Sequence, residues 1–555
     1  MPSRSRPVRR VLLVEANNMS KWVGATIPYE VHIPPLGLMY LAASARQAHP
    51  GIEFRIVESS LPFLSEERLA ELLEEFQPDV VGIRSIAFFL EELQRIATGV
   101  KAWGDALLVA GGPVVQAFKA RLFEEVPELD LAVMGEGERV FCDLLAGTPP
   151  ERLSGVLYRA DGGVVENAGS PEIRDIDGLP FPAYDLVDLD LYARQLSYSY
   201  NHRRQGILLT SRGCAYHCTY CFTHWKNVRL RSAASVFAEI EYLHTRHGIC
   251  DFYVVDDIFN VNVKRALEIF GRILAAGFRL RLYFVNGLRA DLATREFVDR
   301  AIQAGAIWFT YAVESGDPEM QRYIRKNLDL EKTRDIVAYT QRQPVVVNVS
   351  TMFGFPTETP AQAQRTLDYL GELPKPSLLP YHFCLRFFPG CEVNRQAMDA
   401  GWAPGRLEAT SRFSYNDLPM GTPTLSRPEM YRVLLEYHDR FGLSNPAAVD
   451  ASVRTLEAVG YREDEILHMY SVLKRKIVRN MGELKLAWCS SVHSETRSVN
   501  RLNRAGEIHG RYAVGCNWHQ YHRPLIQQDI LNGRRISQRD RGGEHRDNER
   551  KDIND

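Results

Sequence analysis

Three cysteines fall within eight residues of this chain, at Cys214, Cys218 and Cys221. The spacing CxxxCxxC places three thiols on one short loop, and three thiolates can each hold one iron of a cubane [4Fe–4S] cluster. The fourth iron then lacks a protein ligand and can take a substrate. Structural zinc is the alternative, because zinc normally takes four ligands and His217 or His224 could supply the fourth. We favour the cluster, because the loop directly follows a strand of a predicted barrel, where an open site is expected.

Strands and helices alternate around the cysteine loop. Short β-branched segments predict six strands, at residues 207–210, 251–255, 281–285, 307–313, 345–352 and 381–388. A helical pattern follows each of the first five, and in one of them Val236, Ile240 and Leu243 share a face. Six βα units in a row predict a partial (β/α)6 barrel over residues 206–395, with its chemistry at the carboxyl ends of the strands.

Four further motifs lie at predicted strand ends of this barrel. They are Asp256-Asp257 after the second strand, Arg289 with Asp291 after the third, Glu314-Ser315-Gly316 after the fourth, and Gly354-Phe355-Pro356-Thr357-Glu358 after the fifth. Each has an ordinary explanation by itself, such as helix capping by the aspartates or a surface ion pair for the arginine. Their order along the chain, together with the cysteine loop, favours one shared site.

The N-terminal part, residues 9–148, shows a second alternation of strands and helices. Strands are predicted at residues 11–14, 54–57, 80–83, 107–110 and 131–134, and residues 66–77 carry an apolar helical stripe with Ser65 as N-cap. Five such strands predict a parallel, doubly wound sheet of the flavodoxin-like or Rossmann-like type, whose ligand binds beyond the carboxyl ends of the strands. Two glycine-rich turns fall there, Gly111-Gly112-Pro113 and Gly135-Glu136-Gly137-Glu138. They either admit a ligand close to the backbone or simply form tight turns.

Three further segments complete the chain. Residues 149–205 are predicted to form a linker, with a hairpin over residues 155–167 and a proline-stiffened strap at Leu179-Pro180-Phe181-Pro182. Residues 396–490 are predicted to form a helical domain, with helices near residues 428–441, 447–459 and 463–480. Residues 491–555 are polar and are expected to be disordered.

Composition limits the function classes. A length of 555 residues allows two to four domains, and 45% hydrophobic with 25% charged residues is the mix of a globular protein. Lys and Arg number 67 against 69 Asp and Glu, a net charge of −2, which argues against a nucleic-acid or anionic-membrane surface. Nine cysteines are too few for a disulfide scaffold and indicate a reducing compartment. No apolar segment approaches the ~20 residues of a membrane helix and no signal peptide stands out, so we expect a cytoplasmic protein.

The cysteine loop resembles that of the radical S-adenosylmethionine (SAM) enzymes, including an aromatic residue between the second and third cysteines and another directly after them. The four motifs at the strand ends also resemble the family's pattern, although Thr357 stands where glycine is usual. The resemblance implies a [4Fe–4S] cluster on the three cysteines, with SAM chelating the open iron. It further implies SAM contacts at Tyr220, Phe222, Asp256, Asp257, Arg289, Glu314, Ser315, Gly354 and Glu358.

A Rossmann-like domain directly before a radical barrel resembles the layout of the cobalamin-dependent, B12-binding members of this family. The local matches are Pro34-Pro35-Leu36-Gly37-Leu38, the two glycine-rich turns and the strap at residues 179–182. The resemblance implies cobalamin contacts at Ser85, Gly111, Gly112, Pro113, Gly135, Glu136 and Gly137. The D-x-H-x-x-G signature, whose histidine ligates cobalt in other cobalamin enzymes, is absent, since the chain reads Glu15-Ala16-Asn17-Asn18-Met19 after the first strand. The lower face of cobalt is then expected to be unligated or solvated, with His32 as the one histidine nearby.

The resemblance implies a cobalamin-dependent radical SAM methyltransferase that acts on an unactivated carbon of a small-molecule or peptide substrate, through a 5′-deoxyadenosyl radical and methylcobalamin. The alternative is a cyclase or rearrangement enzyme with the same cofactors and no net methylation. A Rossmann-like domain that binds nothing, or a non-catalytic sensor, would carry the same motifs. A flavodoxin or ferredoxin would supply electrons to the cluster. Cys384 and Cys391, at the predicted sixth strand, are expected to be small core residues, with a hydrogen-donating or substrate-binding thiol as the alternative.

Overall fold

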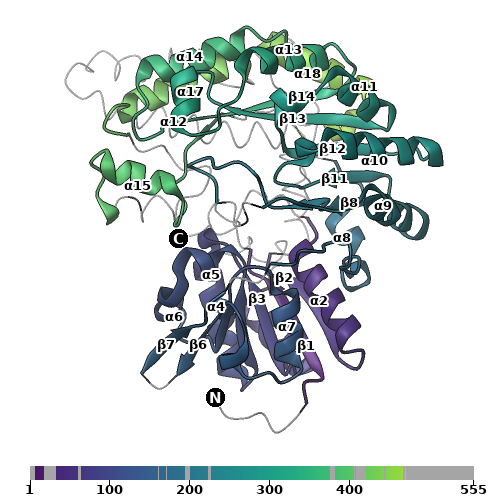
Figure 1. Ribbon diagram of the computed structural model, residues 1–555, viewed down its shortest axis with the longest axis vertical. Coiled ribbons are helices and arrows are strands. Elements are labelled where there is room, and N and C mark those ends of the chain that lie inside the picture. Colours follow the sequence, from purple (N-terminus) through teal and green to yellow (C-terminus); the bar gives the residue numbers. More distant parts are fainter. Residues whose placement is uncertain are drawn as a thin grey trace, which may run out of the picture.

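The computed structural model contains two α/β units, which Figure 1 shows one above the other. The described residues are 7–17, 33–60, 64–160, 162–169, 172–193, 201–222, 225, 227–375, 382–405, 407, 421–442, 445–466 and 469. Of the residues singled out above, His32 and His224 lie outside these ranges, as do most of the predicted helix 463–480 and the whole of residues 491–555.

The N-terminal unit is built on one sheet in the order β2-β1-β3-β4-β5-β6-β7. Five parallel strands come first: β1 (Arg10–Glu15), β2 (Glu53–Glu58), β3 (Val80–Arg84), β4 (Leu107–Gly111) and β5 (Leu131–Val133). The helices among its described residues are α2 (Leu36–Ala48), α3 (Glu66–Phe76), α4 (Leu90–Trp103), α5 (Pro113–Phe118), α6 (Leu122–Glu125) and α7 (Gly137–Leu145). The order 2-1-3-4-5 is that of a flavodoxin-like doubly wound sheet, so the predicted fold class of this unit is confirmed.

The continuous apolar sequence of β1 explains why helices cover both faces of this sheet. Leu12 and Val14 pack with the apolar residues of α3 and α4, whereas Val11 and Leu13 pack with those of α2 and α7. All four side chains are fully buried. Alternate side chains of a strand point to opposite faces, so an unbroken apolar strand requires cover on both sides.

The hairpin that the sequence analysis placed in a linker belongs to the sheet instead. Its strands β6 (Val156–Ala160) and β7 (Gly163–Glu166) continue the sheet beyond β5 in antiparallel pairing. Val156 and Leu157 are fully buried, one in each of the two cores of this unit. These apolar side chains explain why the hairpin extends the sheet rather than lying free between domains.

The second unit is a partial barrel of six parallel strands that are neighbours in chain order. The strands are β8 (Gln205–Leu208), β11 (Asp251–Val254), β12 (Arg281–Leu288), β13 (Ala306–Glu314), β14 (Val346–Phe353) and β15 (His382–Cys384). Helices cover its outer face (Figure 1): α9 (Ala233–His247), α10 (Val263–Ala276), α11 (Arg295–Gln303), α13 (Leu330–Gln341) and α14 (Pro360–Gly371). The predicted partial (β/α)6 barrel is therefore confirmed. The short helices α12 (Pro318–Tyr323) and α15 (Glu392–Asp399) follow β13 and β15.

Polar side chains fix where the barrel helices begin. Asn262 caps α10, Thr294 caps α11, Asp329 caps α13 and Thr359 caps α14, each accepting a backbone N–H of the first turn. An N-cap of this kind contributes about 1 kcal/mol. The turns after the strands are thereby held in register with the helices that follow them.

One of the C-terminal helices contributes to the barrel core. Helices α17 (Arg427–Phe441) and α18 (Pro446–Ala458) match two of the three helices predicted there. Met430, Val433 and Tyr437 of α17 lie in the same apolar cluster as the barrel strands. Within the described residues, α17 thus adds to the core of the barrel.

The strap between the units, which extends to Asp185 in the structure, fastens both of them. The Tyr184 hydroxyl donates to the Glu239 carboxylate of α9 at 2.9 Å and lies 3.1 Å from the carbonyl of Ile207. The backbone N–H of Ala183 donates to the carbonyl of Met39 in α2 at 3.2 Å. The strap therefore holds the first helix of one unit against the first strand of the other.

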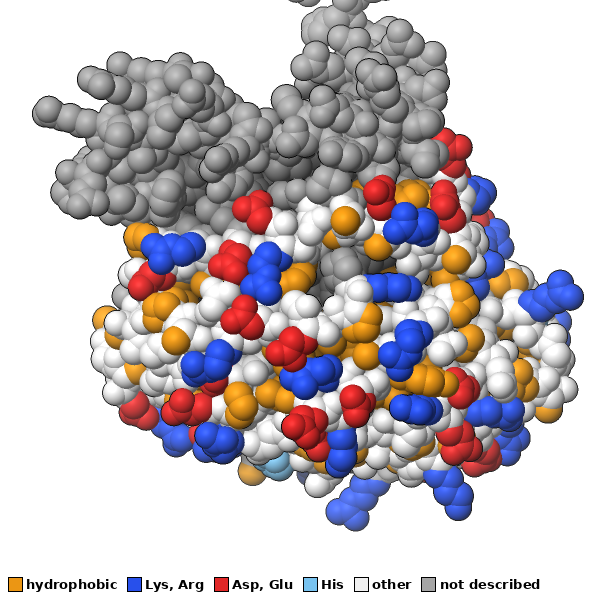
Figure 2. Space-filling view, turned by 90° about the horizontal axis from the view of Figure 1, so that it is seen from above, with side chains coloured by type: hydrophobic (Ala, Val, Ile, Leu, Met, Phe, Trp, Pro, Cys, Tyr) orange, Lys and Arg blue, Asp and Glu red, His pale blue; other side chains and the backbone are white. Residues whose placement is uncertain are grey.

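The surface shown in Figure 2 mixes positive and negative side chains without a field of one sign, as the near-neutral composition predicts. No helix in the described part of the chain is both long and apolar enough to cross a membrane.

Candidate active site

A cavity of about 360 Å³ lies where the two units meet. The N-terminal unit contributes its turns after β4 and β5, including Gly111, Gly112, Gly135, Glu136 and Gly137. The barrel contributes residues around the cysteine loop and after β11, namely Leu209, Ser211, Arg212, Gly213, Trp225 and Asp257. The carboxyl ends of strands from both sheets thus face one space, as expected of ligand sites in parallel α/β folds.

Gly111 and Gly112, in the turn after β4 that lines the cavity, have different structural roles. Gly112 has a φ of +86°, and a Cβ there would lie 2.9 Å from the carbonyl oxygen of Ser85, so its backbone conformation requires glycine. Gly111 has no atom within 4 Å of the position a Cβ would take, so it leaves room at the cavity wall. Ser85 and Pro113 do not line the cavity, because Ser85 supports the turn and Pro113 begins α5.

A pair of short strands closes the cysteine loop at its base, and backbone hydrogen bonds hold its residues in place. Strand β9 (Ser211–Arg212) pairs with β10 (Arg229–Leu230) and so encloses residues 213–228. Gly213 has a φ of +84°, and a Cβ there would meet the carbonyl oxygen of Asn227 at 2.4 Å. The N–H of Cys214 donates to the carbonyl of Trp225 at 3.0 Å.

Two further backbone bonds tie the middle of the loop to the barrel. The N–H of Thr219 donates to the carbonyl of Ile324 at 3.0 Å, and the carbonyl of Thr219 accepts the N–H of Val393 at 2.8 Å. Cys214 and Cys218 are half-buried and Cys221 is exposed. Burial raises the pKa of the Cys214 thiol, and the neighbouring charges of Cys221 and Cys218 add to the rise. The loop therefore presents three thiols that lie close enough to influence one another.

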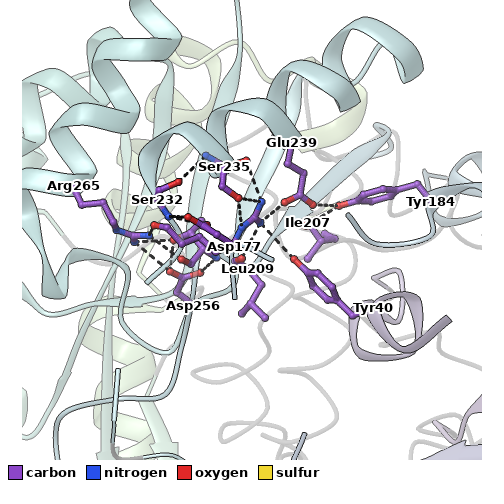
Figure 3. A network of polar contacts seen from close by, with 12 residues as sticks. Tyr40, Asp177, Tyr184, Ile207, Leu209, Ser232, Ser235, Glu239, Asp256 and Arg265 are labelled. Carbon is purple, nitrogen blue, oxygen red and sulfur yellow. Dashed lines mark hydrogen bonds and ion pairs between the residues drawn. The ribbon is translucent and has the colours of Figure 1, made fainter. Parts of the chain in front are cut away.

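The structure separates the two aspartates that follow β11. Asp256 is buried and accepts the Thr210 N–H at 2.6 Å, the Thr210 hydroxyl at 2.5 Å and the Ser211 hydroxyl at 2.6 Å (Figure 3). The guanidinium of Arg265 donates to the carbonyl of Thr210 at 2.8 Å and completes this network. Asp257 is exposed and lines the cavity. Asp256 therefore fixes the chain entering the cysteine loop, and Asp257 is the aspartate that faces ligand space.

Arg289 supports the cysteine loop through an aromatic ring. Its guanidinium carbon lies 3.9 Å from the ring centroid of Tyr216, which stands between the first two cysteines. It also pairs with Asp291 at 2.9 Å and donates to the carbonyl of Asn327 at 3.2 Å. A cation over a tyrosine face is attractive, and these partners orient the guanidinium for it. The R-x-D motif thus contacts the loop directly.

Glu314 and Ser315 end β13 in an irregular backbone. Glu314 has a φ of +69° where the pairing of β13 with β14 shifts register. The ammonium of Lys326 donates to its carboxylate at 3.1 Å, and both side chains are buried. The Ser315 hydroxyl lies 3.1 Å from the hydroxyl of Thr366 and accepts the N–H of Asp317. The polar atoms of Ser315 therefore shape the turn after β13.

The two aromatic residues of the cysteine loop pack against later strand ends. Tyr220 lies edge-on to Phe355, with ring centroids 6.1 Å apart. Burial raises the pKa of Tyr220, followed by the charge of Glu314, so its hydroxyl stays neutral. A Cβ on Gly390 would lie 3.1 Å from the ring of Phe222. Loop and barrel mouth are therefore in direct contact.

The turn after β14 is organised by a buried carboxylate. Glu358 accepts the N–H of Gly354 at 2.5 Å and that of Phe355 at 3.3 Å. Burial raises its pKa to about 8. Gly354 has a φ of +86°, and a Cβ there would lie 2.9 Å from the Met430 side chain. Thr357 is exposed and has no left-handed φ, so the turn tolerates a threonine there.

Several residues that line the cavity belong to no sequence motif, so the sequence did not predict their position there. Tyr40 of α2 and Arg84 at the end of β3 line it, and Arg84 pairs with Glu15. Trp225 lines it from within the cysteine loop. Their positions follow from how the units dock, which no local pattern encodes.

The two cysteines at the sixth strand have different surroundings. Cys391 is buried in an apolar cluster with Leu385 and Phe387. Cys384 is half-buried, and burial raises its pKa to about 11. Among the described residues, no three His, Cys, Asp or Glu side chains are arranged around a single metal ion. A cubane cluster does not require this, because each of its irons takes one thiolate.

Two family models match this chain. Residues 208–370 match the radical SAM superfamily, and residues 21–145 match the B12 binding domain. The chain belongs to the radical SAM enzymes that carry a B12-binding domain. Its cofactors are accordingly a [4Fe–4S] cluster, SAM and cobalamin.

Sequence relatives of this radical SAM enzyme include methyltransferases and cyclases. An uncharacterized methyltransferase, PH0819 of Pyrococcus horikoshii, is 29% identical over 61% of this chain and 73% of its own length. The anaerobic magnesium-protoporphyrin IX monomethyl ester cyclase of Cereibacter sphaeroides is 24% identical over 60% of this chain and 55% of its own length. Methyl transfer is the main activity that the comparisons indicate.

A solved structure shares the fold. The radical SAM methyltransferase TsrM of Kitasatospora setae, with cobalamin and a [4Fe–4S] cluster bound, superposes with a TM-score of 0.62 at 21% identity. The match covers 85% of this chain and 100% of TsrM. At this identity the likeness establishes the fold of both units.

The residues of this radical SAM enzyme fit the groups that the family binds. Three thiols stand on a loop that is closed at its base and bonded to the barrel, as a cluster site requires. Apolar side chains, among them Leu41, Val109 and Phe141, and the open space at Gly111 suit a large, partly apolar macrocycle at the other wall. The individual SAM and cobalamin contacts stay predictions, as does the unligated lower face of cobalt.

Proposed function

We propose that this enzyme transfers a methyl group to an unactivated carbon of a small organic substrate or a peptide. One observation carries the proposal: the glycine-rich turns of the B12-binding unit and the cysteine loop of the barrel line the same cavity. A methyl carrier on one wall and a radical source on the other would then act on one substrate carbon. The established family and its methyltransferase relatives support the same conclusion.

When bound, the cluster with SAM supplies radical chemistry and cobalamin supplies methyl-transfer chemistry. The chain's own part is to hold, orient and shield these groups. Cys214, Cys218 and Cys221 would ligate the cluster, while Asp256 holds the entry to their loop and Arg289 supports it through Tyr216. Exposed Asp257 would meet the polar end of a ligand in the cavity, and the apolar walls would exclude water from it.

The proposal includes a flavodoxin or ferredoxin that supplies electrons to the cluster. It also includes a cytoplasmic location for the enzyme. Cys221 is the exposed cysteine of the loop, so the side of the loop that carries it is where a donor could approach. The reducing compartment expected from the small number of cysteines suits both statements.

Cyclisation or rearrangement without net methylation is the second candidate. The cyclase of Cereibacter sphaeroides is a sequence relative, so relatives differ in the reaction they catalyse. Methylated and unmethylated products distinguish the two activities when SAM carries an isotope label in its methyl group. Label in the isolated product supports methyl transfer, and its absence alongside 5′-deoxyadenosine and a cyclised product supports the second candidate.

Anaerobic reconstitution with iron, sulfide and cobalamin tests the cofactor assignment. Ultraviolet–visible and electron paramagnetic resonance spectra should show a [4Fe–4S] cluster and bound cobalamin in the full chain. Cys218→Ala should lose the cluster and all formation of 5′-deoxyadenosine. Cys250→Ala is the matched control, because this half-buried thiol precedes β11 away from the loop and should leave both intact. Full 5′-deoxyadenosine formation by Cys218→Ala would contradict the proposal.

A further inference from the structure

Two arginines at the base of the cysteine loop reach across to two glutamates of the B12-binding unit. Arg212 pairs with Glu138 at 2.6 Å and with Glu136 at 3.1 Å. Arg229 pairs with the other carboxylate oxygen of Glu136 at 2.7 Å. We call these four residues the interdomain ion cluster. The glutamates belong to the turn Gly135-Glu136-Gly137-Glu138, whose first three residues are the cobalamin contacts that the family resemblance implies.

The interdomain ion cluster is buried, and Arg229 also forms an ion pair with Glu172 at 3.1 Å. The exposed fractions of its side chains are 12% for Arg212 and 8% for each of the other three. The carboxylate of Glu136 also accepts the N–H of Ile173 at 2.6 Å. Burial raises the pKa of Glu136, but the Arg229 hydrogen bond and the charge of Arg212 outweigh it and leave the pKa below its usual value. The carboxylate is therefore ionised at neutral pH and engaged by protein groups.

Each arginine also stacks on an aromatic ring of the cavity wall. Arg212 lies over Tyr40, with 5.3 Å from the guanidinium carbon to the ring centroid, and Arg229 lies over Trp225 at 5.4 Å. Both rings line the cavity. Cations over these faces hold the rings in place. The interdomain ion cluster thus touches the cavity wall from both units while its charges stay paired.

The residues of the interdomain ion cluster belong to two structural elements that the ion pairs connect. Arg212 and Arg229 occupy β9 and β10, the two short strands that close the cysteine loop, so they move with that loop. Glu136 and Glu138 lie in the turn after β5 that lines the cavity, so they move with the B12-binding unit. Buried ion pairs add little net stability compared with apolar packing, yet they accept few alternative arrangements. Their geometry suits fixing a position better than adding stability.

We propose that Arg212, Arg229, Glu136 and Glu138 are positioning residues that set the separation and orientation of the cysteine loop relative to the cobalamin-binding turns. The inference rests on the proposed function, because it assigns the two walls to the two cofactors. Glu136 then acts through the arginines and not through contact with cobalamin. A shift of about 1 Å between reacting groups can cost on the order of 100-fold in rate, so a rigid link of this kind has a direct use.

The other polar links between the units offer a control. Arg46 of α2 and Asp185 of the strap form an ion pair with two contacts, at 2.6 and 2.8 Å, on a more exposed surface. Neither residue lines the cavity or lies in the cysteine loop. Asp185→Asn therefore removes a charge pair at the same interface without touching the base of that loop.

The test measures the magnetic interaction between the reduced [4Fe–4S] cluster and cob(II)alamin by electron paramagnetic resonance in the reconstituted full chain. Dipolar coupling falls with the cube of the separation, so it reports the relative position of the two walls without any substrate. We expect the interaction in the wild type and in Asp185→Asn. We expect it to be lost or broadened in Glu138→Gln and Arg212→Met, with both cofactors still bound. Arg212→Lys, which keeps the charge but not the forked geometry, should give an intermediate spectrum.

Three outcomes would overturn the inference. The first is an unchanged interaction in Glu138→Gln. The second is loss of cobalamin from Glu138→Gln, which would assign this side chain to binding. The third is the same loss of interaction in Asp185→Asn. If Arg212→Met does not take up a cluster, Glu138→Gln decides, because it alters the other unit. A wild type that binds both cofactors but methylates nothing would refute the proposed function and leave this readout intact.

Discussion

Replacing Glu358 by glutamine should make the protein more stable at alkaline pH. The Glu358 side chain is fully buried beneath the turn after β14, and one of its oxygens accepts the N–H groups of Gly354 and Phe355. Burial raises its pKa from 4.5 to about 8, against the smaller opposing effect of these two hydrogen bonds. At neutral pH the folded protein therefore holds a proton that the unfolded chain has released.

The size of the effect follows from this difference in pKa. A raised pKa in the folded state contributes stability that is fully present below the unfolded pKa and is lost as pH rises through the folded pKa. Between pH 5 and pH 8 the loss is about 1.4 kcal/mol per pH unit, or about 4 kcal/mol in all. Glutamine matches the shape of the protonated carboxyl group and does not titrate, so Glu358→Gln should not show this loss. For a unit of this size, 4 kcal/mol corresponds to roughly 10 °C in melting temperature.

The assay compares melting temperatures of wild type and Glu358→Gln in steps from pH 5 to pH 8.5 at constant ionic strength. The difference between the two curves removes contributions from other shifted groups, such as Glu15, whose pKa burial raises to about 7, and His382, whose pKa burial lowers to about 3. The two proteins should melt alike near pH 5, and the variant should melt progressively higher above that. A difference that stays constant across this range would show that Glu358 ionises as it does in water and that the burial argument is wrong.

Two substitutions, one of them with a control variant, test the contacts that hold the cysteine loop and the strap. Gly213→Ala forces a Cβ to within 2.4 Å of the Asn227 carbonyl at a positive φ, so the iron content after reconstitution should fall sharply. The control is Gly271→Ala on α10, where a Cβ would meet no atom within 4 Å. This variant should keep its iron and gain up to about 1 kcal/mol in stability. Equal iron content in the two variants would show that the contact between a Cβ at residue 213 and the Asn227 carbonyl does not disturb the loop. Tyr184→Phe removes the hydroxyl that donates to buried Glu239 and should destabilise the protein by about 1–3 kcal/mol in denaturant unfolding. An unchanged unfolding midpoint would mean that Glu239 is satisfied by its other partners.

Local sequence patterns were sufficient for the elements of both units. The fully buried run from Val11 to Val14 reads as a strand covered on both faces, and Ser65 caps the predicted helix by accepting the N–H of Arg68. In the barrel, strand order followed from the regular alternation of strands and helices, because short connections place successive βα units side by side. In the N-terminal sheet it did not, since β1 lies between β2 and β3. The hairpin after β5 was assigned wrongly to a linker, because an exposed edge strand and a free hairpin have similar patterns.

The sequence by itself determined the kind of chemistry, since three thiols at CxxxCxxC spacing stand on one loop wherever that loop lies. It could not assign different roles to Asp256 and Asp257, because only the pairing of β11 with β8 decides which aspartate faces Thr210 and Ser211. It also could not pair Arg229 with Glu136, 93 residues apart. Such contacts depend on how two separately folded units dock. Docking geometry is set by the summed shape and charge of whole surfaces, whereas local patterns record only the preferences of neighbours along the chain.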